Sequence, residues 1–257
     1  MRFFSIVTIC RNNLDQLKKT YYSIRNQSFT DFEWVVVDGN SDDGTREWLE
    51  KNHLARWRSE KDHGIFDAMN KGMKRSEGRY LIFMNSGDAF ASRDVLEKSY
   101  ERISERSFPG FVYGDSIDID ETGNQFYRRA KAYKMNMIGM ITQHQSMFFA
   151  RNAIGSTLYS DAYPVTGDYA FISEILNKLD AGDILKLDFA VSKFSMGGTN
   201  EQYRYKALKE DFRIRKHIIQ LPFLFNGMLY IMHYLHTMVK KNSPAVRFLR
   251  HKKLNIH

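Results

Sequence analysis

Short apolar runs alternate with amphipathic segments over the first hundred residues of the chain. The apolar runs have the length of buried strands and fall at 3–9, 32–37, 55–58 and 80–84. Between them apolar residues recur at helical spacing, which predicts helices through Leu14 and Ile24, from Thr45, through Met69 and Met73, and through Val95 and Ile103. This β-α-β-α order predicts a mostly parallel sheet with right-handed crossovers.

Polar residues stand where two of these helices would begin. Asn12 or Asn13 precedes the first helix, and Ser92 precedes the fourth. Side chains of these types cap helices by accepting hydrogen bonds from free backbone N–H groups. We therefore expect these residues to cap the two helices.

After about residue 110 the pattern changes. The segment 111–113 is strand-like, and IDIDETGNQFY at 117–127 has a turn signal between two alternating runs, which predicts a hairpin. Strands at 145–150 and 189–195 are separated by a helix at 169–179. We expect one α/β domain over residues 1–200, with an antiparallel second half from 111.

The last part of the chain, residues 201–257, is predicted to be a helical tail. A charged helix at 201–219 precedes LPFLFNGMLYIMHYLHTMV at 221–239, which four polar or flexible residues interrupt, so that we do not expect it to span a membrane. One face of this second helix carries Leu224, Met228, Ile231, Leu235 and Met238. Such a face favours a helix lying in a membrane interface, and docking of this face on the protein's own core is the alternative.

Charge is distributed unevenly between these two parts. The formal net charge is +8, and residues 201–257 hold 12 Lys and Arg against 3 Asp and Glu, a balance of +9. Basic side chains flank the apolar helix and would favour binding to an anionic leaflet; a solvated helix face is the alternative interpretation. These basic residues are Lys240, Lys241, Arg247, Arg250, Lys252 and Lys253.

Overall composition is that of a soluble globular protein, with 43% apolar and 26% charged residues. The single cysteine, Cys10, has no intramolecular partner, which suits a reducing compartment. Residues 3–10 are too short and poorly flanked for a signal peptide. We expect a cytoplasmic protein associated peripherally with the inner face of the cytoplasmic membrane.

Two acidic strings follow predicted strands, WVVVDGNSDDGT at 34–45 and YLIFMNSGD at 80–88. Parallel strands end at one edge of their sheet, and ligands of open α/β sheets bind outside that edge. Carboxylates at this edge can hold a sugar, a base and a hydrated metal. The sequence therefore predicts a nucleotide-linked substrate, with 1–110 binding the nucleotide and 111–200 the acceptor.

Seven strings in order resemble glycosyltransferase family 2 enzymes of GT-A fold over about residues 3–200. They are FSIVTICRN, WVVVDGNSDDGT, SEKDHGIFDAMNKG, YLIFMNSGD, HQSMFFAR, TGDYAF and FSMGGTN. Within the family the chain looks closest to bacterial exopolysaccharide and O-antigen transferases of the colanic-acid type. The resemblance implies an inverting, metal-assisted hexosyltransferase that uses a nucleotide-sugar, expected to be a UDP-sugar.

The resemblance also implies roles for individual donor-side residues. Asp38 would hold the uracil, although an Asp in this place can simply fix its own turn. Asp88 would hold Mg or Mn, but Asn85-Ser86-Gly87-Asp88 keeps only the last carboxylate of the family's D-x-D pattern. Asp42 and Asp43 would either bind the donor or stabilise the turn before Thr45. The remaining residues expected to contact the donor are Thr8, Asp62, Asp67, Asn70, Asn85 and Ser86.

Asp168 in TGDYAF is the implied catalytic base, and a helix-capping role is its structural alternative. Gly167 stands where many family members carry Glu. Asp115 is the second choice as base or as an acceptor ligand. Residues expected near the acceptor or diphosphate are His144, Gly198 and Arg213.

The acceptor expected from this set is a polyprenyl-diphosphate-linked glycan, with an anionic membrane surface and no nucleic acid as further partner. A sugar nucleotidyltransferase is a rival, but the first loop, 10–13, lacks the glycine-rich cradle such enzymes use. A non-catalytic membrane adaptor is another, and it would leave Asp38, Asp88 and Asp168 unexplained together.

Overall fold

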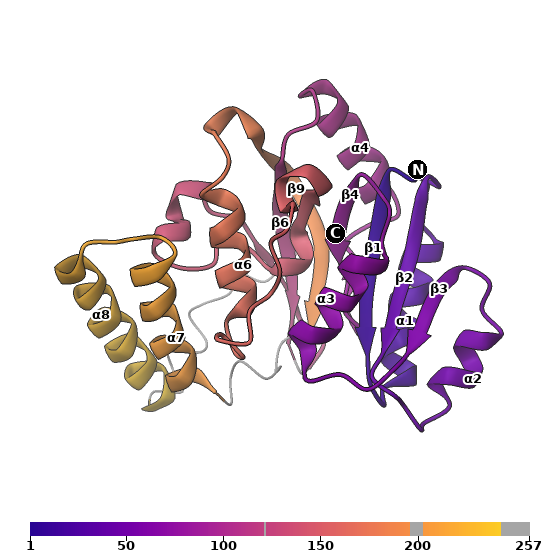
Figure 1. Cartoon of the computed structure of the whole chain (residues 1–257), viewed down its shortest axis with the longest axis horizontal. Helices are drawn as coiled ribbons and strands as arrows, with labels where there is room; N and C mark the ends of the chain where they lie inside the picture. Colours follow the sequence, from indigo (N-terminus) through magenta and orange to yellow (C-terminus); the bar gives the residue numbers. More distant parts are fainter. Residues whose placement is uncertain (121, 196–202, 243–257) are drawn as a thin grey trace.

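The computed structural model describes residues 1–120, 122–195 and 203–242. A single sheet of nine strands runs through the molecule, in the order β3-β2-β1-β4-β8-β6-β9-β5, with β7 beside β6. Helices cover both faces of this sheet, and the last two helices lie together at one end (Figure 1). The predicted α/β class with a helical C-terminal region is confirmed.

The first half of the sheet is parallel, as predicted. Its strands are β1 (Phe4–Cys10), β2 (Phe32–Asp38), β3 (Ala55–Ser59) and β4 (Tyr80–Phe83). Strand β1 lies between β2 and β4, with Cys10 opposite Asp38 at the carboxyl end. The loops that follow these strands therefore emerge at one edge.

The second half is largely antiparallel. Its strands are β5 (Ala89–Phe90), β6 (Phe111–Ile119), β7 (Gln125–Arg128), β8 (Met147–Ala150) and β9 (Ile184–Ser195). Strand β8 joins the halves because it pairs antiparallel with both β4 and β6, whereas β6 and β9 are parallel to each other. Strands β6 and β7 form the predicted hairpin. The strand predicted from 189 begins five residues earlier.

Alternation along the strands separates two cores. On one face Ile6 and Val36 pack under α1 (Leu14–Arg25), α2 (Thr45–Glu50) and α4 (Val95–Glu105). On the other face Val7 and Val35 pack under α3 (Ile65–Arg75) and α6 (Gly167–Leu176). The short elements are α5 (Arg151–Ile154), η1 (Tyr133–Met137), η2 (His144–Ser146) and η3 (Ala181–Asp183).

The two capping predictions need correction. Asn13 does occupy the N-cap of α1, but its side chain makes no capping hydrogen bond. Asp43 supplies that bond instead, because its Oδ2 accepts from the Leu14 backbone N–H at 2.9 Å. Asp94, not Ser92, is the N-cap residue of α4. A carboxylate brought in from a neighbouring loop outcompetes the local amide in the first case.

The C-terminal helices are α7 (Arg204–His217) and α8 (Phe223–Asn242). Helix α7 packs on α6, where Leu208 is buried and Ile214 lies among Tyr163, Tyr169 and Ala170. Helix α8 turns Leu229 and Asn226 inward. In the part of the chain that the structure describes, none of the helices combines the length and apolar content that a membrane span requires.

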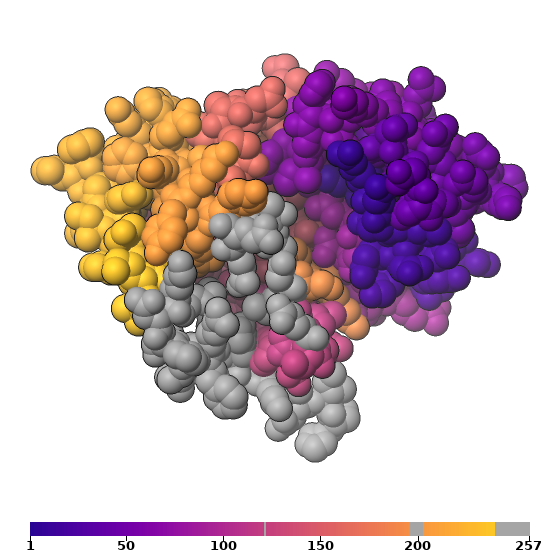
Figure 2. Space-filling view, turned by 90° about the horizontal axis from the view of Figure 1, so that it is seen from below, coloured from indigo at the N-terminus to yellow at the C-terminus, as the bar shows by residue number. Residues whose placement is uncertain are grey.

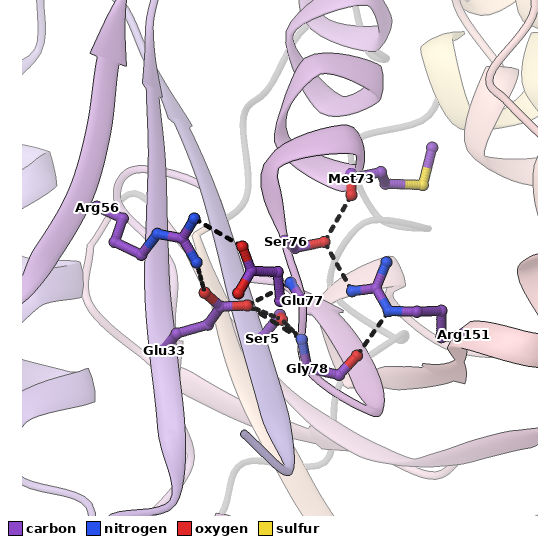
Figure 3. A network of polar contacts seen from close by, with 8 residues as sticks. All are labelled: Ser5, Glu33, Arg56, Met73, Ser76, Glu77, Gly78 and Arg151. Atoms are coloured by element: carbon purple, nitrogen blue, oxygen red, sulfur yellow. Dashed lines mark hydrogen bonds and ion pairs between the residues drawn. The ribbon is translucent and has the colours of Figure 1, made fainter. Parts of the chain in front are cut away.

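A polar network ties the amino ends of the parallel strands together (Figure 3). The Glu33 carboxylate accepts hydrogen bonds from Ser5 Oγ at 2.6 Å and from the Gly78 backbone at 3.0 Å, and it pairs with Arg56 at 2.7 Å. Arg151 donates to the Gly78 carbonyl from the β8 side at 2.9 Å. This network holds the sheet at the edge opposite to the one where the acidic loops emerge.

Candidate active site

Loops from three strands meet at the carboxyl edge of the parallel half. A Cβ atom placed on Gly39, after β2, would lie 2.5 Å from Asp62 Oδ2 and 3.2 Å from the side chain of Arg11. Glycine at this position therefore lets the loops after β1, β2 and β3 approach closely. Asp62 also accepts a hydrogen bond from the Gly64 backbone at 3.1 Å, which shapes the turn before α3.

Asp38 lies at this edge but is fully buried. Its carboxylate accepts hydrogen bonds from Ser41 Oγ, from the Ser41 backbone at 3.0 Å and from Ser59 Oγ at 2.6 Å. Cys10 Sγ lies 3.7 Å from Oδ1, and burial together with this carboxylate raises the pKa of the thiol. The carboxylate thus fixes its own turn, which is the structural role the sequence also allowed.

Asp88 follows β4 and is 6% exposed. Burial raises the pKa of its carboxyl to about 7, although hydrogen bonds from Gln145 and the Ser195 backbone oppose this shift. The Gln145 contact is 2.7 Å long and joins η2 to the Asp88 loop. Nearby, Asn85 Oδ1 is buried and has no hydrogen-bond partner among the described residues. A carboxylate that resists ionisation next to an unpaired carbonyl oxygen is an arrangement that a cation would stabilise.

Asp168 stands in the first turn of α6 and is partly exposed. The Tyr169 backbone N–H donates to its Oδ1 at 2.8 Å. Burial raises the pKa of Asp168 to about 6, and the charge of Glu210 adds to this shift. The preceding Gly167 packs on the Phe66 ring at the start of α3, so that a Cβ there would lie 2.7 Å from that ring. Any larger residue in place of Gly167 would push α6 away from α3.

A chain of contacts links Asp168 to Asp88. The Tyr159 ring stacks between Phe66 and Phe171, at 5.2 and 4.3 Å between centroids, beside the start of α6. Its hydroxyl lies 2.8 Å from His144 Nε2. His144 adjoins Gln145, which holds Asp88. Burial and the charge of Asp168 raise the pKa of Tyr159, so Asp168 and Asp88 flank one aromatic cluster, which includes Phe83 at the end of β4.

Three predicted contact residues are used inside the protein instead. The Thr8 hydroxyl is buried between the Met84 carbonyl and the Trp34 indole. The Asn70 amide makes two hydrogen bonds to the Tyr159 backbone, both 2.9 Å. His144 stacks on Phe83 at 4.9 Å, and burial lowers its pKa to about 3. These three residues support the site through contacts inside the protein, and their polar atoms are not brought to the site.

Most other predicted residues lie around the site. Asp67 accepts from the His63 backbone and pairs with Lys71 at 2.9 Å, and these contacts lower its pKa. Ser86 donates to Asn13 Oδ1 at 3.1 Å. Gly198 lies outside the described residues. Asp42 is exposed, whereas Asp43 holds the turn at Thr45 as well as capping α1.

Asp115 lies in strand β6 and Arg213 in helix α7, and each contacts a neighbouring segment. The Asp115 carboxylate is buried and accepts from Tyr127 Oη at 2.6 Å and from the Ala130 backbone at 2.7 Å, so it anchors the hairpin. Arg213 is exposed, donates to the Ala162 carbonyl at 3.4 Å and covers the Tyr163 ring. Gln145 lies in the motif HQSMFFAR, but the sequence indicates no role for it, because its contact with Asp88 depends on the β4–β8 pairing.

Comparison with known proteins identifies this architecture. The model for "Glycosyl transferase family 2" matches residues 5–165. The chain belongs to glycosyl transferase family 2. The match covers the loops with Asp38, Asp62 and Asp88 and ends three residues before Asp168.

Curated relatives of this family 2 glycosyltransferase carry related names. An uncharacterized glycosyltransferase of Mycobacterium tuberculosis is 35% identical over 176 residues, which are 65% of this chain and 66% of that protein. A putative teichuronic acid biosynthesis glycosyltransferase of Bacillus subtilis, TuaG, is 35% identical over 108 residues, 40% of this chain and 42% of its own length. This chain thus spans just under two thirds of the first of these relatives.

Solved structures confirm the GT-A fold. Residues 1–349 of Staphylococcus aureus TarS in complex with UDP superpose with a TM-score of 0.67 and 17% identity, over 90% of this chain and 70% of that one. The mannosyltransferase PcManGT from Pyrobaculum calidifontis, in complex with GDP-Man and Mn²⁺, gives a TM-score of 0.64 and 16% identity over 91% and 70%. At these identities the likeness concerns the fold alone.

Proposed function

We propose that this family 2 glycosyltransferase moves a hexose, with inversion, from a UDP-sugar to a lipid-linked glycan in the synthesis of a bacterial surface polysaccharide such as O-antigen, capsule or exopolysaccharide. The TuaG name and the UDP complex of TarS support the product class and the nucleotide. The observation that carries the proposal is Asp168, a partly exposed carboxylate with a pKa of about 6 at the ligand edge of the sheet.

Asp168 has the properties that a general base requires. A base works best when its pKa lies near the working pH, because it is then ionised and still able to take a proton. In the proposed step Asp168 accepts the proton of the acceptor hydroxyl, whose oxygen attacks the anomeric carbon. The bond from that carbon to the diphosphate breaks, and its electrons leave with UDP. Attack from the opposite face gives a β-linkage from an α-linked donor.

Asp88 and Asn85 provide the donor side of this proposal. Their buried carboxylate and unpaired carbonyl oxygen would hold a divalent Mg or Mn ion, which neutralises charge on the departing diphosphate. Among the described residues no three His, Cys, Asp or Glu side chains form a metal cluster, so the remaining ligands would be diphosphate and water oxygens. Gln145 orients Asp88 for this role.

Helix α8 supports a lipid-linked acceptor and peripheral attachment to the inner face of the membrane. The stripe predicted from sequence faces outward, with Leu224, Ile231 and Leu235 exposed by 84, 59 and 55%. The same exposed face also carries Phe223, Met228 and Met232. The alternative, docking of the stripe on the described core, is not what the structure has. An exposed apolar helix face that is followed in the sequence by basic residues is typical of membrane-surface helices.

The decisive experiment is Asp168→Asn in the purified protein, scored by UDP release from a panel of UDP-sugars with and without manganese. We expect transfer to fall at least ~100-fold, because the variant cannot take the proton. Asp161→Asn, an exposed acid in the segment that precedes α6, is the control and should keep full activity. Full transfer by the Asp168 variant would remove the assignment of the base, and release of pyrophosphate from UTP and a sugar phosphate would favour a nucleotidyltransferase.

A further inference from the structure

Glu210 reaches from α7 into the turn that presents Asp168. The Glu210 side chain is buried at 3% exposure. Its Oε2 accepts hydrogen bonds from the Val165 backbone at 2.9 Å, the Thr166 backbone at 2.9 Å and the Thr166 hydroxyl at 3.2 Å. Thr166 is the N-cap residue of α6, and Asp168 follows two residues later. One carboxylate from a distant helix therefore satisfies the backbone donors at the entrance to the catalytic turn.

Burying the Glu210 carboxylate in this way costs free energy of folding. Buried carboxylates are normally paired with cations, whereas the second oxygen of Glu210, Oε1, is buried and has no hydrogen-bond partner within the described part of the chain. Two further carboxylates, Asp168 and Asp211, lie close enough for charge repulsion. Burial raises the pKa of Asp211 to about 7, and the charges of Asp168 and Glu210 add to this shift, whereas Arg215 opposes it. A neutral acceptor would anchor the same turn without adding negative charge.

We propose that Glu210 is a positioning residue for the transfer reaction: it fixes the Val165–Thr166 backbone so that Asp168 faces the acceptor, and its negative charge keeps Asp168 a strong proton acceptor. The proposal depends on the role of Asp168 proposed above. It also makes α7, which the sequence assigned to a separate tail, part of the catalytic apparatus.

The test compares Glu210→Gln with wild type. Glutamine keeps a carbonyl oxygen for the backbone donors but removes the charge, so we expect the donor KM to be unchanged, kcat to fall about 10-fold, and the acid limb of the rate profile to move to lower pH. Glu210→Ala removes the anchor as well and should lower kcat further. The control is Glu174→Gln, which removes a charge from α6 two turns beyond Asp168 and should change neither kcat nor the limb.

Two measurements test the role of Glu210 independently of which residue is the catalytic base. Carboxyl NMR should give a lower pKa for Asp168 in Glu210→Gln, and hydrogen exchange at the Val165 and Thr166 amides should be faster in Glu210→Ala, whichever residue proves to be the base. An unchanged pKa together with unchanged exchange overturns the proposal. The proposal is also overturned if Glu210→Gln keeps full kcat and an unchanged acid limb while Asp168→Asn is inactive. If Asp168→Asn is active, the proposed function is overturned instead.

Discussion

Two carboxyls at the site, Asp88 and Asp168, hold their protons more tightly than free aspartate does, because both are desolvated by the surrounding protein. Their neighbours differ in kind. Asp88 lies beside neutral amides from Gln145 and Asn85, whereas Asp168 lies near the anionic Glu210. A cation is therefore favoured at the first and a proton at the second. This difference in surroundings agrees with the different tasks proposed for the two acids.

The pH dependence of transfer should report Asp168. With a pKa of about 6, the base is protonated and inactive below that pH and ionised above it. We expect kcat/KM under saturating manganese to fall about tenfold for each unit below pH 6 and to level off above it. A profile that stays flat down to about pH 4 would contradict the assignment. Circular dichroism over the same range must show that the protein remains folded.

The Asp88 carboxylate should lower stability at neutral pH when no cation is bound. Its folded pKa of about 7 lies above the unfolded value of 3.8, so the folded state loses stability as pH rises between these values. Asp88→Asn should therefore raise the metal-free Tm above pH 7 by several degrees, a gain on the order of a few kcal/mol. The same variant should lose transfer activity and the manganese-dependent rise in Tm. Equal responses of both proteins to manganese would contradict metal binding here.

Residue types and their positions after strands could be predicted from sequence, but the use of each polar atom could not. Asp88 was singled out as an acid that follows an apolar run, and the roles of Asp88 and Asp168 were taken from the family resemblance of their motifs. Thr8 and Asn70 were expected at the donor, yet partners 76 and 89 residues away occupy their polar atoms. Glu210 was missed for the same reason, since its three donors lie about 44 residues away in sequence. Such pairings arise only from the packing of distant elements.

At the scale of elements, periodicity predicted the helices and strands well, and their ends were set by contacts. The helix predicted from 169 begins at Gly167, and the strand predicted from 145 begins at Met147 because 144–146 forms a 3₁₀ turn. Alternation identifies which residues face a core but not which neighbouring strand they pair with. The parallel β6–β9 pairing, for instance, leaves no local signal in either strand.

The network around Glu33 should stabilise the parallel strands in a pH-dependent way (Figure 3). Burial raises the pKa of Glu33, but hydrogen bonds from Ser5, the Glu77 and Gly78 backbones and Arg56 more than offset this, so the pKa lies below 4.5. Its stabilisation is therefore present above about pH 4.5 and lost as pH falls through the lower folded value. Glu33→Gln should lower the free energy of unfolding by about 1–3 kcal/mol at neutral pH.

Urea titrations at several pH values test this expectation. The difference between wild type and Glu33→Gln should narrow as the solution is acidified. Glu77→Gln is the matched control, because that carboxylate binds the same Arg56 from an exposed position, 69% accessible, and should change stability by less than ~1 kcal/mol. A constant difference across the pH range would show that the charge of Glu33 is not what stabilises the sheet.

In the whole molecule, helix α7 connects the proposed catalytic edge of the sheet to the apolar helix α8. Helix α7 contacts the turn before Asp168 through Glu210. It packs against α8 (Figure 1), and the exposed face of α8 is apolar. Figure 2 shows these helices at the opposite end of the molecule from β1–β3 and their loops. A membrane bound at α8 would therefore hold a lipid-linked acceptor on the Asp168 side while leaving the nucleotide side open to solution.

Replacing Ile231 and Leu235 with Glu tests this arrangement. Both side chains are more than half exposed, so the fold should survive, while burial of each in lipid is worth about 1.5–3 kcal/mol. We expect at least tenfold weaker sedimentation with anionic vesicles, unchanged UDP release with a water-soluble acceptor analogue, and slower transfer to a lipid-linked acceptor. His236→Glu adds one negative charge, against two in the double variant, at an exposed position of α8 beside the apolar face and should bind vesicles far better. If the double variant instead converts a dimer to a monomer and vesicle binding is unaffected, the apolar face binds a second copy of the chain and the membrane proposal is wrong.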